Sequence, residues 1–108
     1  MADQFRERET QFEAKFAHDE ELRFKAIAHR NRLFAGWVAE QMGAASPADY
    51  AETLREYAFG RKAEELVARA LQDLGEARVV ISEVKAWRTL ERCLEQSVQD
   101  VLQAHNSD

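Results

Sequence analysis

Three side chains that could bind an anion lie at helical spacing: Lys25, His29 and Arg32. Their separations of four and three residues would place them side by side on one face of an α-helix. An ammonium and a guanidinium group beside an imidazole could bind a phosphate or an acidic partner. A solvated charged face without any ligand explains the same pattern, and the sequence leaves both interpretations open.

Residue patterns typical of metal sites and of phosphate-binding loops do not occur in the sequence. Helical di-metal sites place a Glu three residues before a His, whereas Lys15, Ala26 and Leu102 occupy those positions before the three histidines. There is no His-Glu-x-x-His zinc motif and no glycine-rich phosphate loop. The single cysteine, Cys93, is expected to be a packing residue. We therefore expect no metal site and no enzymatic activity.

The cationic face belongs to a stretch that is expected to form a long central helix, residues 19–43. Asp19 is the expected N-cap and Gly43 the expected stop. Because a surface helix needs only one apolar face, two opposed faces predict that this helix has neighbours on both sides. One face carries Phe24, Ile27, Ala28, Phe34, Ala35, Val38 and Met42, and the other carries Leu22, Ala26, Leu33 and Trp37.

Asn31 interrupts the first of these two apolar faces. A buried amide needs hydrogen-bond partners. Asn31 is therefore interpreted either as a structural hydrogen-bonding residue or as a specific contact, with the structural role favoured. Arg23 and Arg30 are assigned to a further, charged side of the same helix.

The next helical stretch covers residues 47–74. Ser46 as N-cap with Pro47 in the first turn is typical of a helix start. Gly60 interrupts the apolar pattern, and Gly75 is the expected end. The stretch is therefore either one bent helix or two consecutive helices.

A short β-branched run, residues 79–81, precedes the last helix and is interpreted as a buried extended connection. Ser82 is the expected N-cap of that helix, which covers residues 82–104. Its apolar residues fall on one stripe about 120° wide, typical of an amphipathic helix.

The first 17 residues carry a narrower aromatic stripe. Phe5, Phe12 and Phe16 share one edge of a helix only about 40° wide, against the roughly 100° of a core-facing helix. The pattern predicts a loosely held N-terminal helix, although an ordinary first bundle helix would also fit. Together these elements predict an all-α fold: a four-helix bundle with a long central helix and a loosely held N-terminal helix.

Length and charge limit the remaining possibilities. The chain has 108 residues and a formal net charge of −5, so we expect one domain, residues 1–108, that does not bind nucleic acid. No apolar run is long enough to span a membrane, and a charged start argues against a secretory signal. The lone cysteine fits a reducing cytoplasm.

The sequence resembles the zeta-subunit family, small ATPase-inhibitor proteins of the F-type ATP synthase in alphaproteobacteria. The resemblance is close over residues 5–43 and looser beyond them. It depends on four runs: Phe5-Arg6-Glu7-Arg8-Glu9, Phe12-Glu13-Ala14-Lys15-Phe16-Ala17-His18-Asp19-Glu20-Glu21-Leu22-Arg23-Phe24-Lys25-Ala26, Arg30-Asn31-Arg32-Leu33 and Trp37-Val38-Ala39-Glu40.

The resemblance implies a regulatory inhibitor whose residues 1–17 enter a catalytic interface of the ATPase head and block ATP-driven rotation. The implied partners are the alpha, beta and gamma subunits, and the implied location is cytoplasmic, peripheral to the inner membrane through the synthase. Some relatives are thought to bind adenine nucleotide, so weak ATP or ADP binding by Lys25, His29 and Arg32 is the alternative function. The implied inhibitory surface consists of Phe5, Arg6, Arg8, Glu9, Phe12, Glu13 and Phe16.

Overall fold

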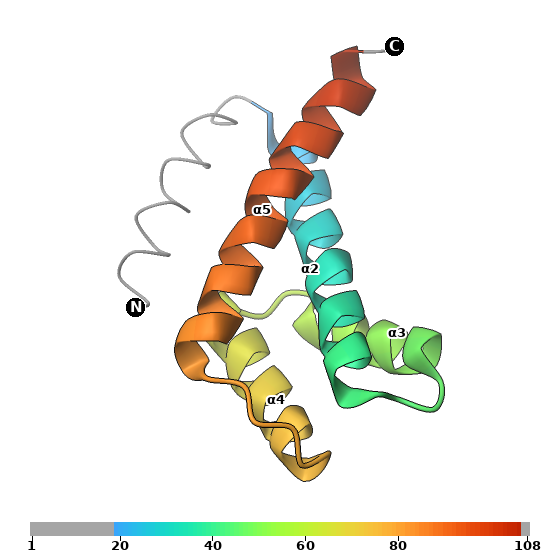
Figure 1. Ribbon diagram of the computed structural model, residues 1–108. Coiled ribbons are helices and arrows are strands. Elements are labelled where there is room, and N and C mark those ends of the chain that lie inside the picture. Colours follow the sequence, from blue (N-terminus) through green and yellow to red (C-terminus); the bar gives the residue numbers. More distant parts are fainter. Residues whose placement is uncertain (1–18, 107–108) are drawn as a thin grey trace.

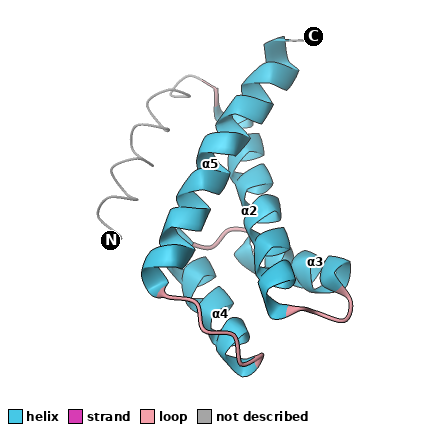
Figure 2. Cartoon of the chain, viewed as in Figure 1, coloured by secondary structure: helices cyan, strands magenta, loops and turns pink. Residues whose placement is uncertain are grey.

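The computed structural model describes residues 19–106 and shows four α-helices with no strand among them (Figures 1 and 2). The expected all-α, four-helix architecture is confirmed. The predicted loosely held N-terminal helix lies outside the described residues. The helices are α2 (Glu20–Met42), α3 (Pro47–Ala58), α4 (Ala63–Glu76) and α5 (Glu83–Asn106).

Helix α2 begins and ends at the residues that the sequence predicts. The Asp19 carboxylate accepts a hydrogen bond of 3.0 Å from the backbone N–H of Leu22. At the other end Gly43 adopts the left-handed conformation, with φ of 63° and ψ of 38°. This conformation lets the Ala44 N–H reach back to the Ala39 carbonyl at 3.3 Å, which closes the helix as in a Schellman motif.

Residues 47–74 form two helices rather than one bent helix. Pro47 occupies the first turn of α3, as expected, although the Ser46 side chain makes no capping hydrogen bond. After Ala58 the chain becomes extended at Phe59, and Gly60 follows with a φ of 74°. Because a glycine takes this left-handed conformation without steric cost, the chain turns here and α4 starts three residues later.

Two expectations about the link from α4 to α5 are wrong. Helix α4 continues through Gly75 to Glu76, and the left-handed residue that follows is Arg78, with a φ of 63°. The connection is extended but not buried throughout, because Val80 is 97% exposed. Its neighbours Val79 and Ile81 pack against the core, so alternation along an extended chain turns the middle side chain outward.

Helix α5 starts as predicted and ends slightly later. The Ser82 hydroxyl accepts a hydrogen bond of 3.0 Å from the Lys85 backbone N–H, and the Ser82 carbonyl accepts one from Ala86. The helix then runs to Asn106. Figure 1 shows α5 antiparallel to α2, with α3 and α4 gathered beside the C-terminal half of α2.

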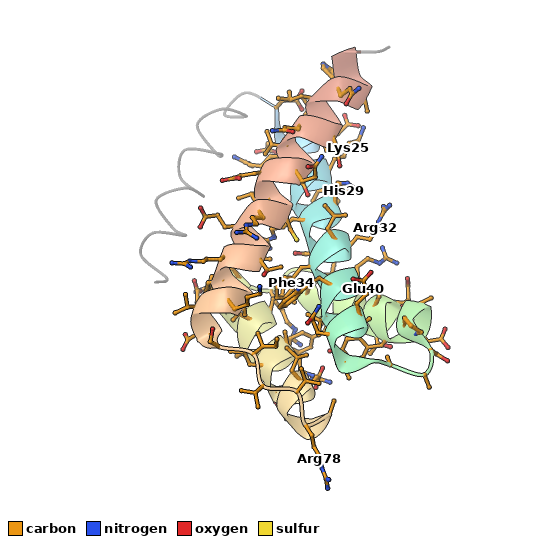
Figure 3. The ribbon with its side chains drawn as sticks, in the orientation of Figure 1. Lys25, His29, Arg32, Phe34, Glu40 and Arg78 are labelled. Atoms are coloured by element: carbon orange, nitrogen blue, oxygen red, sulfur yellow. The ribbon has the colours of Figure 1, made fainter. Side chains whose placement is uncertain are left out.

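The central position of α2 is confirmed, since it contacts α3, α4 and α5. The main core contains side chains from all four helices, with Phe34 fully buried and pointing into the bundle (Figure 3). The buried residues of this main cluster are Phe34, Ala35, Val38, Leu54, Ala58, Ala63, Leu66, Val67, Ala70, Leu74, Ala86, Trp87 and Leu90.

A second, smaller cluster joins the N-terminal half of α2 to the C-terminal half of α5. Its buried members are Leu22, Ala26 and Leu94. Along α2 the two clusters are separated by two buried polar residues, Arg30 and Asn31. The bundle therefore has one large core shared by four helices and one small core between two helices.

Candidate functional site

The residues predicted to form the inhibitory surface lie outside the described residues. They are Phe5, Arg6, Arg8, Glu9, Phe12, Glu13 and Phe16. The structure does show where this segment joins the bundle. The junction is the N-cap Asp19, at the end of the α2–α5 pair that projects beyond α3 and α4 (Figure 1).

The charged side chains in the first turns of α2 stabilise the start of this helix. Glu20 and Glu21 lie in the first turn, where the helix dipole stabilises carboxylates. Arg23 Nη2 lies 3.7 Å from a Glu20 carboxylate oxygen. The acidic run of Asp19, Glu20 and Glu21 is therefore explained as a helix start. The described residues contain no group of three potential metal ligands.

The predicted cationic face exists, but two of its three members already have acidic neighbours. Lys25 Nζ lies 3.1 Å from a Glu21 oxygen, and His29 Nε2 lies 2.9 Å from Asp100 Oδ2 on α5. Arg32 is exposed further along the same helix (Figure 3). Since ligand phosphates would have to compete with both carboxylates, the face is a weaker anion site than its sequence indicates. Its ligand-binding role stays a prediction.

His29 and Asp100 also tie the two long helices together across the small core. Hydrogen bonds from Gln96 and then His29 hold the pKa of Asp100 below its usual range. A carboxylate that accepts two such bonds stays ionised. The imidazole of His29 thus has a structural partner 71 residues away along the chain.

The sequence interpretation missed the buried position of Arg30. This side chain is only 3% exposed, and its Nε and Nη2 donate hydrogen bonds of 3.1 and 2.9 Å to Asn31 Oδ1. The amide of Asn31 thus has the structural role favoured from its place in an apolar stripe. In the sequence, an amide at a position on an apolar face was the one indication that a polar partner lies inside the bundle.

Cys93 offers no activated nucleophile. Burial raises the pKa of its thiol to about 11, and the opposing effect of the nearby Arg30 charge is smaller. Because the thiolate is the reactive form, a thiol with so high a pKa is poorly suited to covalent catalysis. This agrees with a packing role for Cys93 on α5.

Comparison with known proteins supports the family resemblance. The family model described as ATPase inhibitor subunit zeta matches residues 1–100. No curated protein and no solved structure matches the chain significantly. Within the described part of the chain, no helix is long and apolar enough to cross a membrane.

The matched region includes the four described helices almost to the end of α5, together with the preceding segment. A match over most of the chain applies to the whole bundle rather than to one motif. The family name also implies interaction with ATP synthase, in a regulatory and not an enzymatic role. The chain belongs to the zeta-subunit family of ATPase inhibitors.

Proposed function

We propose that residues 1–17 form the inhibitory arm of this protein, inserting at a catalytic interface of the ATPase head and blocking ATP-driven rotation. The family match supports this proposal, since it covers the arm as well as the bundle. Alternating aromatic and charged side chains suit such a role, because large aromatic anchors ringed by charges carry most of the energy of many interfaces.

The described helices explain what the bundle contributes to this function. Asp19 follows the proposed arm and caps α2, which packs in a core shared among four helices. The arm is therefore attached to a body with its own packed interior. Its contacts would be with the alpha, beta and gamma subunits, and the protein would be peripheral to the inner membrane on the cytoplasmic side through the synthase.

The test is ATP hydrolysis by the purified ATPase head in the presence of two proteins, the full chain and a variant lacking residues 1–17. We expect the full chain to inhibit hydrolysis and the truncated one to lose inhibition while circular dichroism shows that its helices remain. A full-length control with Phe5, Phe12 and Phe16 changed to Ser tests the aromatic anchors separately. Equal inhibition by the truncated and full-length proteins would show that the arm is assigned wrongly.

The direction of inhibition can be measured on membrane vesicles that contain the whole synthase. The proposed arm blocks hydrolysis and leaves synthesis largely intact. Adding the protein should therefore lower ATP hydrolysis while respiration-driven ATP synthesis continues. A parallel loss of both activities would contradict this part of the proposal.

Weak ATP or ADP binding by Lys25, His29 and Arg32 remains the second candidate function. The exposure of Arg32 favours it, whereas the neighbours of Lys25 and His29 compete with it. Titration with ATP while amide chemical shifts are recorded should produce changes centred on residues 25–32, and Arg32→Gln should reduce them. The absence of shifts at millimolar ATP would remove this function.

A further inference from the structure

The apolar stripe of α2 is longer than the helix that covers it. A helix of 23 residues such as α2 is about 35 Å long, and one of 12 residues such as α3 about 18 Å. Phe34, Ala35 and Val38 are fully buried, whereas Phe24 on the same stripe is 61% exposed and Ala28 is exposed as well. The expectation that Phe24 packs in the core is therefore wrong, because α3 ends at Ala58 before reaching it.

A groove of about 490 Å³ lies over this uncovered part of the stripe. Its walls are the N-terminal half of α2 and the turn between α3 and α4. Phe24 and Phe59 meet edge to face across it, with ring centroids 6.2 Å apart. Phe59 is 71% exposed, so both rings leave apolar surface exposed at the mouth of the groove.

The charged residues around the groove are mostly basic. Four basic residues and one acidic residue line it: Arg23, Arg30, Arg61, Lys62 and Glu20. This local excess of three positive charges contrasts with the net charge of −5 of the whole chain.

Three of these cations already have partners: Arg30 is buried and hydrogen-bonded to Asn31, whereas Arg23 and Arg61 remain at the surface. Arg61 Nη1 lies 3.2 Å from Glu65, and its guanidinium stacks on Tyr57, 4.2 Å from the ring centroid. Arg23 has the Glu20 contact described above. Lys62, exposed at the start of α4, adds a further positive charge at the rim. The groove thus combines an apolar floor with a positive rim.

We propose that this groove is a second docking surface, which binds an acidic helical segment with a large apolar anchor on the surface of the ATPase head. A helix is the occupant because its apolar side chains could pack along the N-terminal half of α2, against Phe24 and Phe59. Acidic residues would face Arg23, Arg61 and Lys62. The proposal rests on the proposed function, since it names a further contact with the same partner.

The groove variant is the full chain with Phe59→Ser and Lys62→Glu, both at exposed positions. The matched control, Val80→Ser and Lys85→Glu, makes the same changes in polarity and charge at exposed positions outside the groove. Binding of each protein to the purified ATPase head is measured by interferometry at low and high salt, and hydrolysis is measured in parallel. Light scattering gives the mass of each protein alone.

We expect the groove variant to bind the head at least about tenfold more weakly than the wild type, as for loss of one aromatic anchor. Its binding should also depend less on salt, because a rim cation is lost. The control should bind like the wild type. Inhibition at saturating groove variant should reach the wild-type level, since the arm is unchanged.

The outcomes separate this proposal from the arm mechanism. Equal binding by the groove variant and the wild type at both salt concentrations overturns the groove alone. A wild type that binds without inhibiting contradicts the arm, and loss of that binding in the groove variant would still support the groove. A wild type that does not bind the head overturns both. A wild-type dimer that the groove variant loses would assign the groove to a second copy of the chain and overturn the proposal.

Discussion

The buried pair of Arg30 and Asn31 gives the sharpest test of how this bundle is held together. Replacing Asn31 by Leu keeps a side chain of similar size in α2. It removes the Asn31 Oδ1 acceptor to which Arg30 Nε and Nη2 donate at 3.1 and 2.9 Å. The guanidinium remains buried, because Arg30 is only 3% exposed.

The expected cost follows from the two hydrogen bonds. A hydrogen bond from a charged donor contributes about 1.5–3 kcal/mol, and because both bonds share one acceptor we take a combined loss of about 3–4 kcal/mol. Burial of the new Leu side chain and its better helix propensity return about 1 kcal/mol. The free energy of unfolding should therefore fall by about 2–3 kcal/mol, which for a domain of this size lowers Tm by about 10–20 °C.

The assay is urea denaturation followed by circular dichroism, with Asn31→Asp as the control. This control keeps a side-chain oxygen facing Arg30 and should lose less than about 1 kcal/mol. The dependence of unfolding free energy on urea concentration should be unchanged, since the surface exposed on unfolding stays the same. Wild-type stability in Asn31→Leu would refute the structural role of the pair, as would equal losses in Leu and Asp.

Four further predictions test local features of the fold. Gly75→Ala should raise the unfolding free energy by about 1 kcal/mol in thermal melts, because the added methyl group meets nothing within 4 Å. Gly43→Ala at a φ of +63° should lower it by about 1 kcal/mol, and equal shifts would contradict both assignments. Tyr50 donates a 2.7 Å hydrogen bond to Asp73, and burial, then that carboxylate, raises the pKa of Tyr50. This stabilisation is complete below about pH 10 and decreases at higher pH. Urea midpoints should therefore fall more between pH 8 and 11 in the wild type than in Tyr50→Phe. Equal falls in the two proteins would contradict the stabilising role of the Tyr50 hydroxyl. Because burial raises the pKa of Cys93 to about 11, a thiol reagent at pH 8 should react at least about tenfold more slowly with folded than with urea-unfolded protein, and equal rates would show an accessible thiolate.

The helix ends could be predicted from the sequence because capping depends on a few neighbouring residues. Asp19 and Ser82 accept hydrogen bonds from backbone N–H groups three residues ahead. Gly43 ends α2 locally, because its left-handed conformation lets the next residue, Ala44, donate a hydrogen bond back to Ala39. The end of α4 was predicted wrongly for the same local reason. The sequence favours Gly75 as the end of the helix, whereas α4 continues to Glu76 and the left-handed residue is Arg78, a position that no glycine marks.

Burial could not be predicted where it depends on the length of a neighbouring helix. Phe24 has the right helical spacing for the core, but α3 stops short of it. Arg30 was interpreted as a surface charge, since its partner could be recognised only once Asn31 was known to lie inside. Periodicity describes one helix at a time and contains no information on what covers it.

The candidate cationic site could be predicted only in part, because a sequence pattern describes one helix and not the helices beside it. The spacing of Lys25, His29 and Arg32 correctly indicates positions on one helix. It gives no sign of Asp100, which approaches His29 from the far end of the chain. The residues of the proposed arm stay a prediction from family resemblance and spacing, since they lie outside the described part of the chain.

The separation of the two apolar clusters has a consequence for the order of folding. The small cluster joins Leu22 and Ala26 to Leu94, so it closes a loop of about 70 residues and is expected to form after local contacts. Substitutions there should speed unfolding and leave the refolding rate nearly unchanged, with φ-values close to zero at Leu22. During synthesis this end of α2 would lack its partner among the described helices until α5 leaves the ribosome.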